Sequence, residues 1–103
     1  MSPTSLATRA FYNSTFCDEY VYLGKTIFGM QDQNIEVEHT RQRAIKVQVS
    51  DIGVITLDAK GVEQLPSRDI SIDGNVLDII SWQYHGNMRE EIILVIEGDS
   101  RGN

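Results

Sequence analysis

The sequence predicts an all-β protein, a small antiparallel β-barrel or sandwich with a flexible N-terminal arm. Its length of 103 residues fits one domain. Several short segments alternate apolar and polar residues with the two-residue period of a strand, and no stretch of ten or more residues has a helical period. A chain with this many strands must protect its sheet edges, which favours a closed or double-layered sheet.

The chain divides into a flexible N-terminal arm (1–18), a β-barrel-like domain (19–98) and a short flexible tail (99–103). The arm is rich in Ser, Thr, Ala and Asn, so it can bury little surface by itself. We expect its large apolar side chains to dock on a neighbouring protein: Phe11, Tyr12 and Phe16.

The start of the chain has one basic residue and no continuous apolar stretch, unlike a secretion signal. No apolar run approaches the roughly 20 residues that a membrane helix needs. We therefore expect a protein made in the cytoplasm that has no contact with a membrane.

The first half predicts a strand at 20–30, interrupted or bent near Gly24, because this segment is rich in β-branched and aromatic residues. The polar cluster 31–34 predicts a turn. Segments 35–38 and 45–50 both alternate apolar and polar residues, so we expect two strands that pair antiparallel.

The middle of the chain has weaker patterns. Segment 51–59 predicts another short strand, although its period is less regular. In segment 60–66, Val62 and Leu65 are three residues apart, which fits one helical turn or an irregular loop that stops at Pro66.

The last third has the clearest pattern. Apolar segments at 70–72, 76–84 and 92–96 are separated by Asp-Gly-Asn and His-Gly-Asn turns. Asp-Gly between alternating segments is a strong hairpin signal, because glycine accepts the positive φ of a tight turn. Two successive hairpins predict a three-stranded meander, in which Ile80, Trp82 and Tyr84 share one face and pack in the core or, as the alternative, form an interface.

Residues that could support catalysis or metal binding are scattered. Cys17 is the only cysteine, which excludes an intrachain disulfide and a multi-thiolate zinc site. Segment 69–75 resembles the start of a calcium loop, but Ile80 stands where the closing acid belongs. His39 and His85 lie in polar segments without a nucleophile motif. We expect no enzyme activity, no metal and no cofactor.

The charge is unevenly distributed. Up to residue 50, five acids balance five bases, whereas from residue 51 onward ten acids face four bases and account for the net charge of −6. An acidic half repels a phosphate backbone, so we expect no specific binding of nucleic acid. Arg41 and Arg43, in the polar stretch before residue 44, are candidate contacts for an acidic surface of a partner protein.

The order of these segments resembles the small head–tail joining proteins of long-tailed bacteriophages, the lambda-type attachment or head-closure family. The resemblance follows TIFGMQDQNIEVE, RAIKVQVSD, GVEQLPSRD, ISIDGNVLDIISWQYHG and EEIILVIEG in that order. One hallmark of the family is a hairpin before the last strand, whose places are occupied by Ile70, Ile72, Gly74 and segment 77–79.

The resemblance implies a non-enzymatic structural protein of the virion neck, made in the host cytoplasm. It would form a homo-oligomeric ring, hexameric or dodecameric, between the portal or adaptor protein of the DNA-filled head and a tail protein. DNA would pass through the acidic lumen without specific binding. The alternatives are a tail-completion or tail-hub protein of the same particle, or an acidic phage-encoded inhibitor that binds a host factor.

Overall fold

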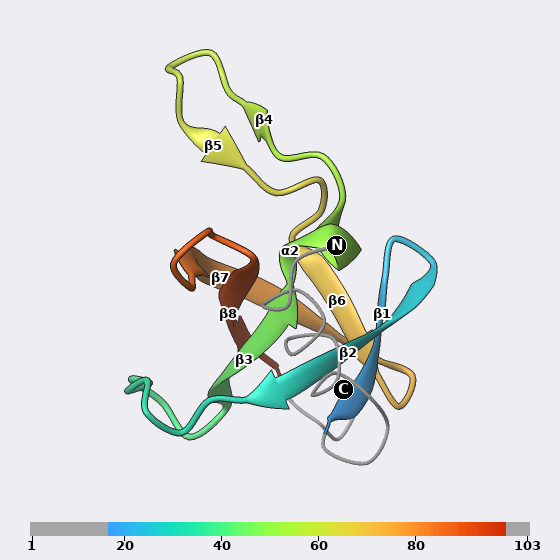
Figure 1. The fold of residues 1–103 in the computed structure, drawn as a ribbon. Helices are drawn as coiled ribbons and strands as arrows, with labels where there is room; N and C mark the ends of the chain where they lie inside the picture. The colour runs from blue at the N-terminus through green and yellow to red at the C-terminus, as the bar shows by residue number, and fades with distance from the viewer. Residues whose placement is uncertain (1–16, 99–103) are drawn as a thin grey trace.

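The computed structural model describes residues 17–98, which form a closed antiparallel barrel with strand order β1-β2-β3-β8-β7-β6 (Figure 1). The predicted all-β class is confirmed, and of the two predicted architectures, barrel or sandwich, the structure has the barrel. The barrel strands are β1 (Asp18–Tyr22), β2 (Lys25–Gln31), β3 (Gln42–Gln48), β6 (Asp69–Ile72), β7 (Asn75–His85) and β8 (Glu91–Glu97). No helix in this part of the chain is long and apolar enough to cross a lipid bilayer.

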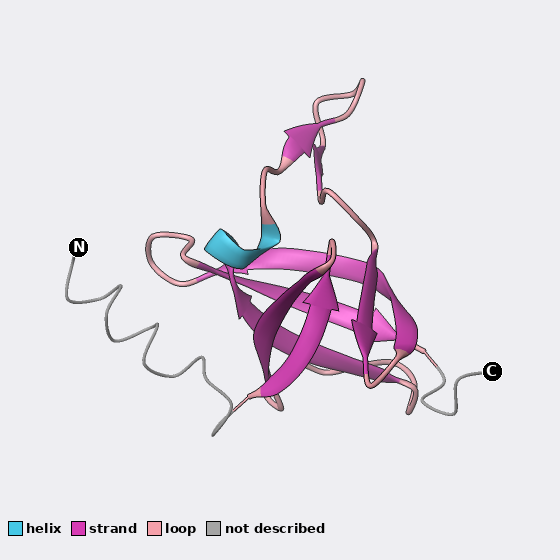
Figure 2. Cartoon of the chain, turned by 90° about the vertical axis from the view of Figure 1, so that its right-hand side faces the viewer, coloured by secondary structure: helices cyan, strands magenta, loops and turns pink. Residues whose placement is uncertain are grey.

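An excursion between β3 and β6 carries the remaining elements. It begins with one helical turn, α2 (Val49–Ile52), and continues into a small two-stranded sheet of β4 (Thr56–Leu57) and β5 (Glu63–Gln64). This β4–β5 hairpin stands away from the barrel in both views (Figures 1 and 2).

Two tight turns join barrel strands. Leu23 and Gly24 have φ values of 54° and 76°, and Asp73 and Gly74 have φ values of 52° and 81°. Positive φ at both central residues is the geometry that matches the right-handed twist of paired strands. The interruption near Gly24 is therefore a complete hairpin turn between β1 and β2, and the Asp-Gly hairpin between β6 and β7 is confirmed.

Strand β8 lies between β3 and β7, paired along its length with β3 and, through a bulge, with β7. The predicted three-stranded meander β6-β7-β8 is confirmed. One irregularity interrupts it: the register shifts between Ile79 and Ser81, so Ile80 is an extra residue in a β-bulge.

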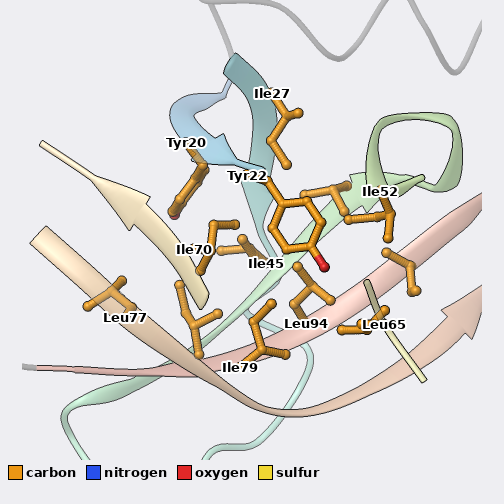
Figure 3. Close-up of a cluster of buried hydrophobic side chains, with 13 residues drawn as sticks. Tyr20, Tyr22, Ile27, Ile45, Ile52, Leu65, Ile70, Leu77, Ile79 and Leu94 are labelled. Carbon is orange, nitrogen blue, oxygen red and sulfur yellow. The ribbon is translucent and has the colours of Figure 1, made fainter. Parts of the chain in front are cut away.

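The core fills the barrel with side chains that alternate along its strands (Figure 3). Tyr20 lies over Gly29, where an added Cβ would stand only 3.0 Å from the Tyr20 ring. The Tyr22 hydroxyl accepts a hydrogen bond from the Ser67 N–H at 2.9 Å and donates one to the Ser67 carbonyl at 2.5 Å. The fully buried side chains of the core cluster are Tyr20, Tyr22, Ile27, Ile45, Val47, Ile52, Ile70, Ile92, Leu94 and Ile96.

The predicted strand at 51–59 is a strand only at Thr56–Leu57, because the segment begins within α2, and the predicted strand at 35–38 is wrong. Segment 35–38 is not a strand, because it belongs to the loop 32–41 that turns the chain from β2 back to the adjacent β3. Polar side chains hold this loop: Asp32 accepts the Asn34 N–H, and Gln42 accepts the Glu38 N–H. For segment 60–66 the helical turn is wrong and the irregular loop is closer, since the segment is irregular apart from the short strand Glu63–Gln64 of the β4–β5 hairpin.

Candidate protein-interaction surfaces

The β4–β5 hairpin exposes apolar side chains. Leu57 is paired with Glu63 across the hairpin and is 66% exposed, while Val54, in the chain leading into β4, is 77% exposed. Val62, just before β5, is also exposed. Aliphatic side chains gathered on a hairpin away from the core make it a candidate surface for contact with another protein.

Asp58 organises the tip of this hairpin. Its Oδ1 accepts the backbone N–H groups of Lys60 and Val62 at 2.8 and 2.9 Å, and its Oδ2 accepts the Gln64 side-chain amide at 3.3 Å. Its backbone N–H donates to the Val62 carbonyl, and its carbonyl accepts the Gly61 N–H. One carboxylate therefore fixes the turn and the positions of the side chains around it.

The root of the hairpin is attached to the barrel. Ile52 and Leu65, before and after the hairpin, are buried in the core cluster. The Tyr84 hydroxyl on β7 donates to the Glu63 carboxylate at 2.9 Å, and the Arg89 guanidinium lies 4.8 Å from the centre of the Tyr84 ring. Partial burial of the Tyr84 hydroxyl raises the pKa of Tyr84, and the neighbouring Glu63 carboxylate raises it further. The hairpin is therefore an ordered projection whose base is fixed to the barrel.

Two further exposed side chains lie at the same end of the barrel. Leu23 is in the β1–β2 turn, and Met88 is in the turn between β7 and β8. The Val49 N–H donates to the Glu90 carbonyl at 3.0 Å, which ties the start of α2 to the β7–β8 turn. We call this surface the hairpin end; it comprises Leu23, Val54, Leu57, Val62 and Met88.

A second surface is concave. Two adjoining cavities of about 280 and 300 Å³ lie between the loop 32–41 and the outer face of β7 and β8, and they share Glu36, Ser81 and Val95. The loop is at the opposite end of the barrel from the hairpin (Figure 1). We call the two cavities the loop groove; its apolar lining includes Ile35, Val37, Ile80 and Val95, and its acidic lining is Glu36 and Glu38.

The β-bulge decides which side chains line the groove. Ile80 is the extra residue, and it points away from the core with 42% of its surface exposed. Trp82 and Tyr84 stand opposite Leu94 and Ile92, which are buried, and Trp82 packs against the core cluster. The prediction that Ile80 shares a face with these two aromatic residues is wrong, because the bulge shifts the alternation by one residue.

Of the predicted docking residues, the structure describes Arg41 and Arg43. Phe11, Tyr12 and Phe16 lie outside the described residues. Arg41 is exposed at the end of the loop before β3, and its carbonyl accepts the Gly98 N–H at 3.3 Å. Arg43 is within β3 rather than in the loop, and its guanidinium lies 6.0 Å from the centre of the Tyr20 ring.

Three acidic side chains form a row across adjacent strands. Asp69 on β6 is opposite Asp78 on β7, which is opposite Glu97 on β8. The Gln42 side chain on β3 donates to the Glu97 carboxylate at 3.0 Å. Asp73 is not part of this row, because it lies in the turn at the other end of β6.

No group of three His, Cys, Asp or Glu side chains within residues 17–98 has the arrangement of a metal site. His85 Nδ1 lies 3.0 Å from the Glu91 carboxylate at the end of the β7–β8 pair. Comparisons with models of protein families, with curated proteins and with solved structures find no match for this chain.

Proposed function

We propose that this protein is a non-enzymatic structural protein of a long-tailed bacteriophage, located at the neck of the virion. It forms a ring that joins the portal or adaptor protein of the DNA-filled head to the tail. The resemblance of its strand order to head–tail joining proteins supports this assignment, and a closed six-strand barrel is a compact scaffold for a ring subunit.

The observation that carries the proposal is the β4–β5 hairpin. Its exposed side chains, Val54, Leu57 and Val62, stand on a turn fixed by Asp58 and a root fixed by Glu63. A projection that is already ordered loses little conformational entropy on docking, and its apolar side chains gain stability when a partner covers them. Such a projection is suited to binding another protein.

The charge of the chain fits a channel for DNA. A ring of subunits that each carry a net charge of −6 repels the phosphate backbone, so DNA can move through it without adhering. In the assembled ring, the acidic row of Asp69, Asp78 and Glu97 should then face the lumen.

Electron microscopy of mixtures with virion parts tests this function. The purified protein is mixed separately with DNA-filled tailless heads and with free tails from the same phage. Ring density at the portal vertex, together with heads that become able to accept tails, is the expected result. Binding to tails alone would instead indicate a tail-completion or tail-hub protein.

The acidic row favours a second candidate, an inhibitor that presents carboxylates to a basic site on a host protein. Asp69, Asp78 and Glu97 are directly opposite one another on adjacent strands, so their charges are concentrated on one patch. This candidate predicts no association with heads or tails, and a salt-sensitive complex with a host protein.

A further inference from the structure

We propose that the hairpin end of one copy docks into the loop groove of the next copy, and that this contact builds the ring. The inference rests on the proposed function, which it deepens by naming the two surfaces that join neighbouring subunits. Both surfaces consist of residues within 17–98 of a single chain.

The two surfaces are complementary in shape and polarity. The hairpin presents Leu57 and Val62 on a narrow, ordered projection, whereas the groove is a hollow with Ile80 and Val95 in its lining. At the β-bulge Ile80 and Ser81 both face outward, so two successive side chains of β7 line the groove. Bulges often redirect a side chain to a functional surface.

One pair of opposite charges can form between the two surfaces. Lys60 is exposed at the tip of the hairpin, and Glu36 and Glu38 are exposed in the groove. The two acids of the hairpin are already engaged by its own donors, since Asp58 accepts the turn amides and Glu63 accepts the Tyr84 hydroxyl. Both carboxylates keep their charge but are held within the hairpin, so Lys60 is the group of the tip that can pair with Glu36 or Glu38 of the groove.

The placement of the two surfaces favours a ring. The hairpin is at one end of the barrel, whereas the groove lies on the outer face of β7 and β8 under the loop 32–41. When the two surfaces of a copy engage two different neighbours, the contact is heterologous rather than two-fold. Each subunit uses its hairpin on one neighbour and its groove on the other. Such contacts close into a ring when the rotation between neighbours divides a full turn.

Variants that each lose one of the two surfaces test this inference. Leu57→Asp removes the hairpin contact, and Ile80→Asp removes the groove contact; Val37→Asp is a second groove variant in the loop. Val76→Asp is the matched control, because Val76 is 66% exposed, like Leu57, but lies beside the β6–β7 turn. Sedimentation of each protein up to about 1 mM measures the assembly state.

The wild-type protein and Val76→Asp should form closed oligomers, and the Leu57→Asp and Ile80→Asp proteins should each be monomeric. An equimolar mixture of these two variants should form a dimer, since one intact hairpin meets one intact groove and neither chain can bind a further copy. A mixture that stays monomeric, or variants that assemble like the wild type, would overturn the proposal.

Charge reversal gives an independent readout. Lys60→Glu should weaken assembly about two- to fivefold, and Glu38→Lys in the same chain should restore it, because the exposed pair is rebuilt with opposite polarity. Failure of the second substitution to restore assembly would contradict the proposed pairing of tip and groove.

The outcomes separate this inference from the proposed function. A wild-type protein that is monomeric at every concentration, yet binds heads through its hairpin, retains the neck function and shows that the hairpin docks on a different protein. A protein that assembles through the hairpin and groove, yet binds neither heads nor tails, retains the contact and refutes the neck function.

Discussion

Single side chains hold the excursion that carries the hairpin. Tyr22 is buried in β1, yet its hydroxyl reaches both backbone groups of Ser67, at the point where the excursion returns to the barrel. Asp58 performs the same task at the tip. In each case one side chain satisfies several polar groups and so fixes a segment that has little core of its own.

Tyr22→Phe should lower the free energy of unfolding by about 1–3 kcal/mol, because the Ser67 N–H and carbonyl lose their partner in a partly buried place. Urea denaturation measures this change. Tyr84→Phe is the matched control: its hydroxyl makes an exposed hydrogen bond, so the expected change is within about 0.5 kcal/mol. Equal losses of unfolding free energy in the two variants would contradict the role given to Tyr22.

Stability should also fall at alkaline pH. Burial raises the pKa of Tyr20 and of Tyr22 above the ordinary value of 10.0; Arg43 opposes the shift at Tyr20, and the Ser67 hydrogen bond opposes it at Tyr22. The folded state therefore holds these protons more tightly than the unfolded state. Their contribution is fully present below pH 10 and is lost as the pH rises through the raised values.

Urea denaturation on either side of pH 10 measures this dependence. In the Tyr22→Phe variant, one of the two titrating groups is absent, so stability should decline less steeply above pH 10 than in the wild type. A steeper or an unchanged decline would show that Tyr22 does not retain its proton in the folded state.

Among the elements, the β4–β5 hairpin is the one whose order depends most on local hydrogen bonds. Its strands have only two residues each, and its apolar side chains face outward. A hairpin of this size is not stable by itself. The Asp58 carboxylate at the tip and the Tyr84–Glu63 contact at the root supply what the short strands lack.

Asp58→Ala should loosen the tip without destabilising the barrel. Hydrogen exchange of the Lys60 and Val62 amides should become about tenfold faster or more, because both lose their acceptor, while the core amides of β8 remain unchanged. Asp32→Ala, which removes a similar hydrogen bond from the loop 32–41, should leave these two amides unaffected. Unchanged exchange in Asp58→Ala would contradict the account of the tip.

The acidic row should be a local source of instability. Asp78 stands between Asp69 and Glu97, and like charges directly opposite on paired strands repel. Asp78→Asn should raise the unfolding free energy by roughly 0.2–1 kcal/mol, and less in high salt. Glu19 stands opposite the apolar Phe28, so Glu19→Gln is the control and should change the unfolding free energy little. A loss of stability in Asp78→Asn would refute the repulsion.

The elements differ in how well the sequence predicts them. The β6–β7–β8 meander is predictable because Asp73-Gly74 marks a turn and because β7 and β8 are long, with 11 and 7 residues. The β4–β5 hairpin is missed because its strands are too short to alternate, and because apolar residues are expected to face inward. Its only sequence signal is the turn from Asp58 to Gly61. Nothing in the sequence marks the bulge at Ile80, since neither Gly nor Pro accompanies it.

For the whole molecule, the closed barrel is a scaffold that separates two surfaces. Each barrel strand is paired on both sides, so contacts with other proteins are expected from the loops rather than from a free strand edge. The hairpin and the loop 32–41, at opposite ends of the barrel (Figure 1), are the candidates for such contacts.

The most direct test of this account compares Leu57→Ser with Val76→Ser in their retention on DNA-filled tailless heads and on tails. Both side chains are 66% exposed, so the two substitutions remove similar exposed apolar surface and differ mainly in place. We predict that Leu57→Ser lowers retention about tenfold and that Val76→Ser leaves it unchanged. Equal retention of both variants would contradict the central claim that the hairpin is the docking element of a neck protein.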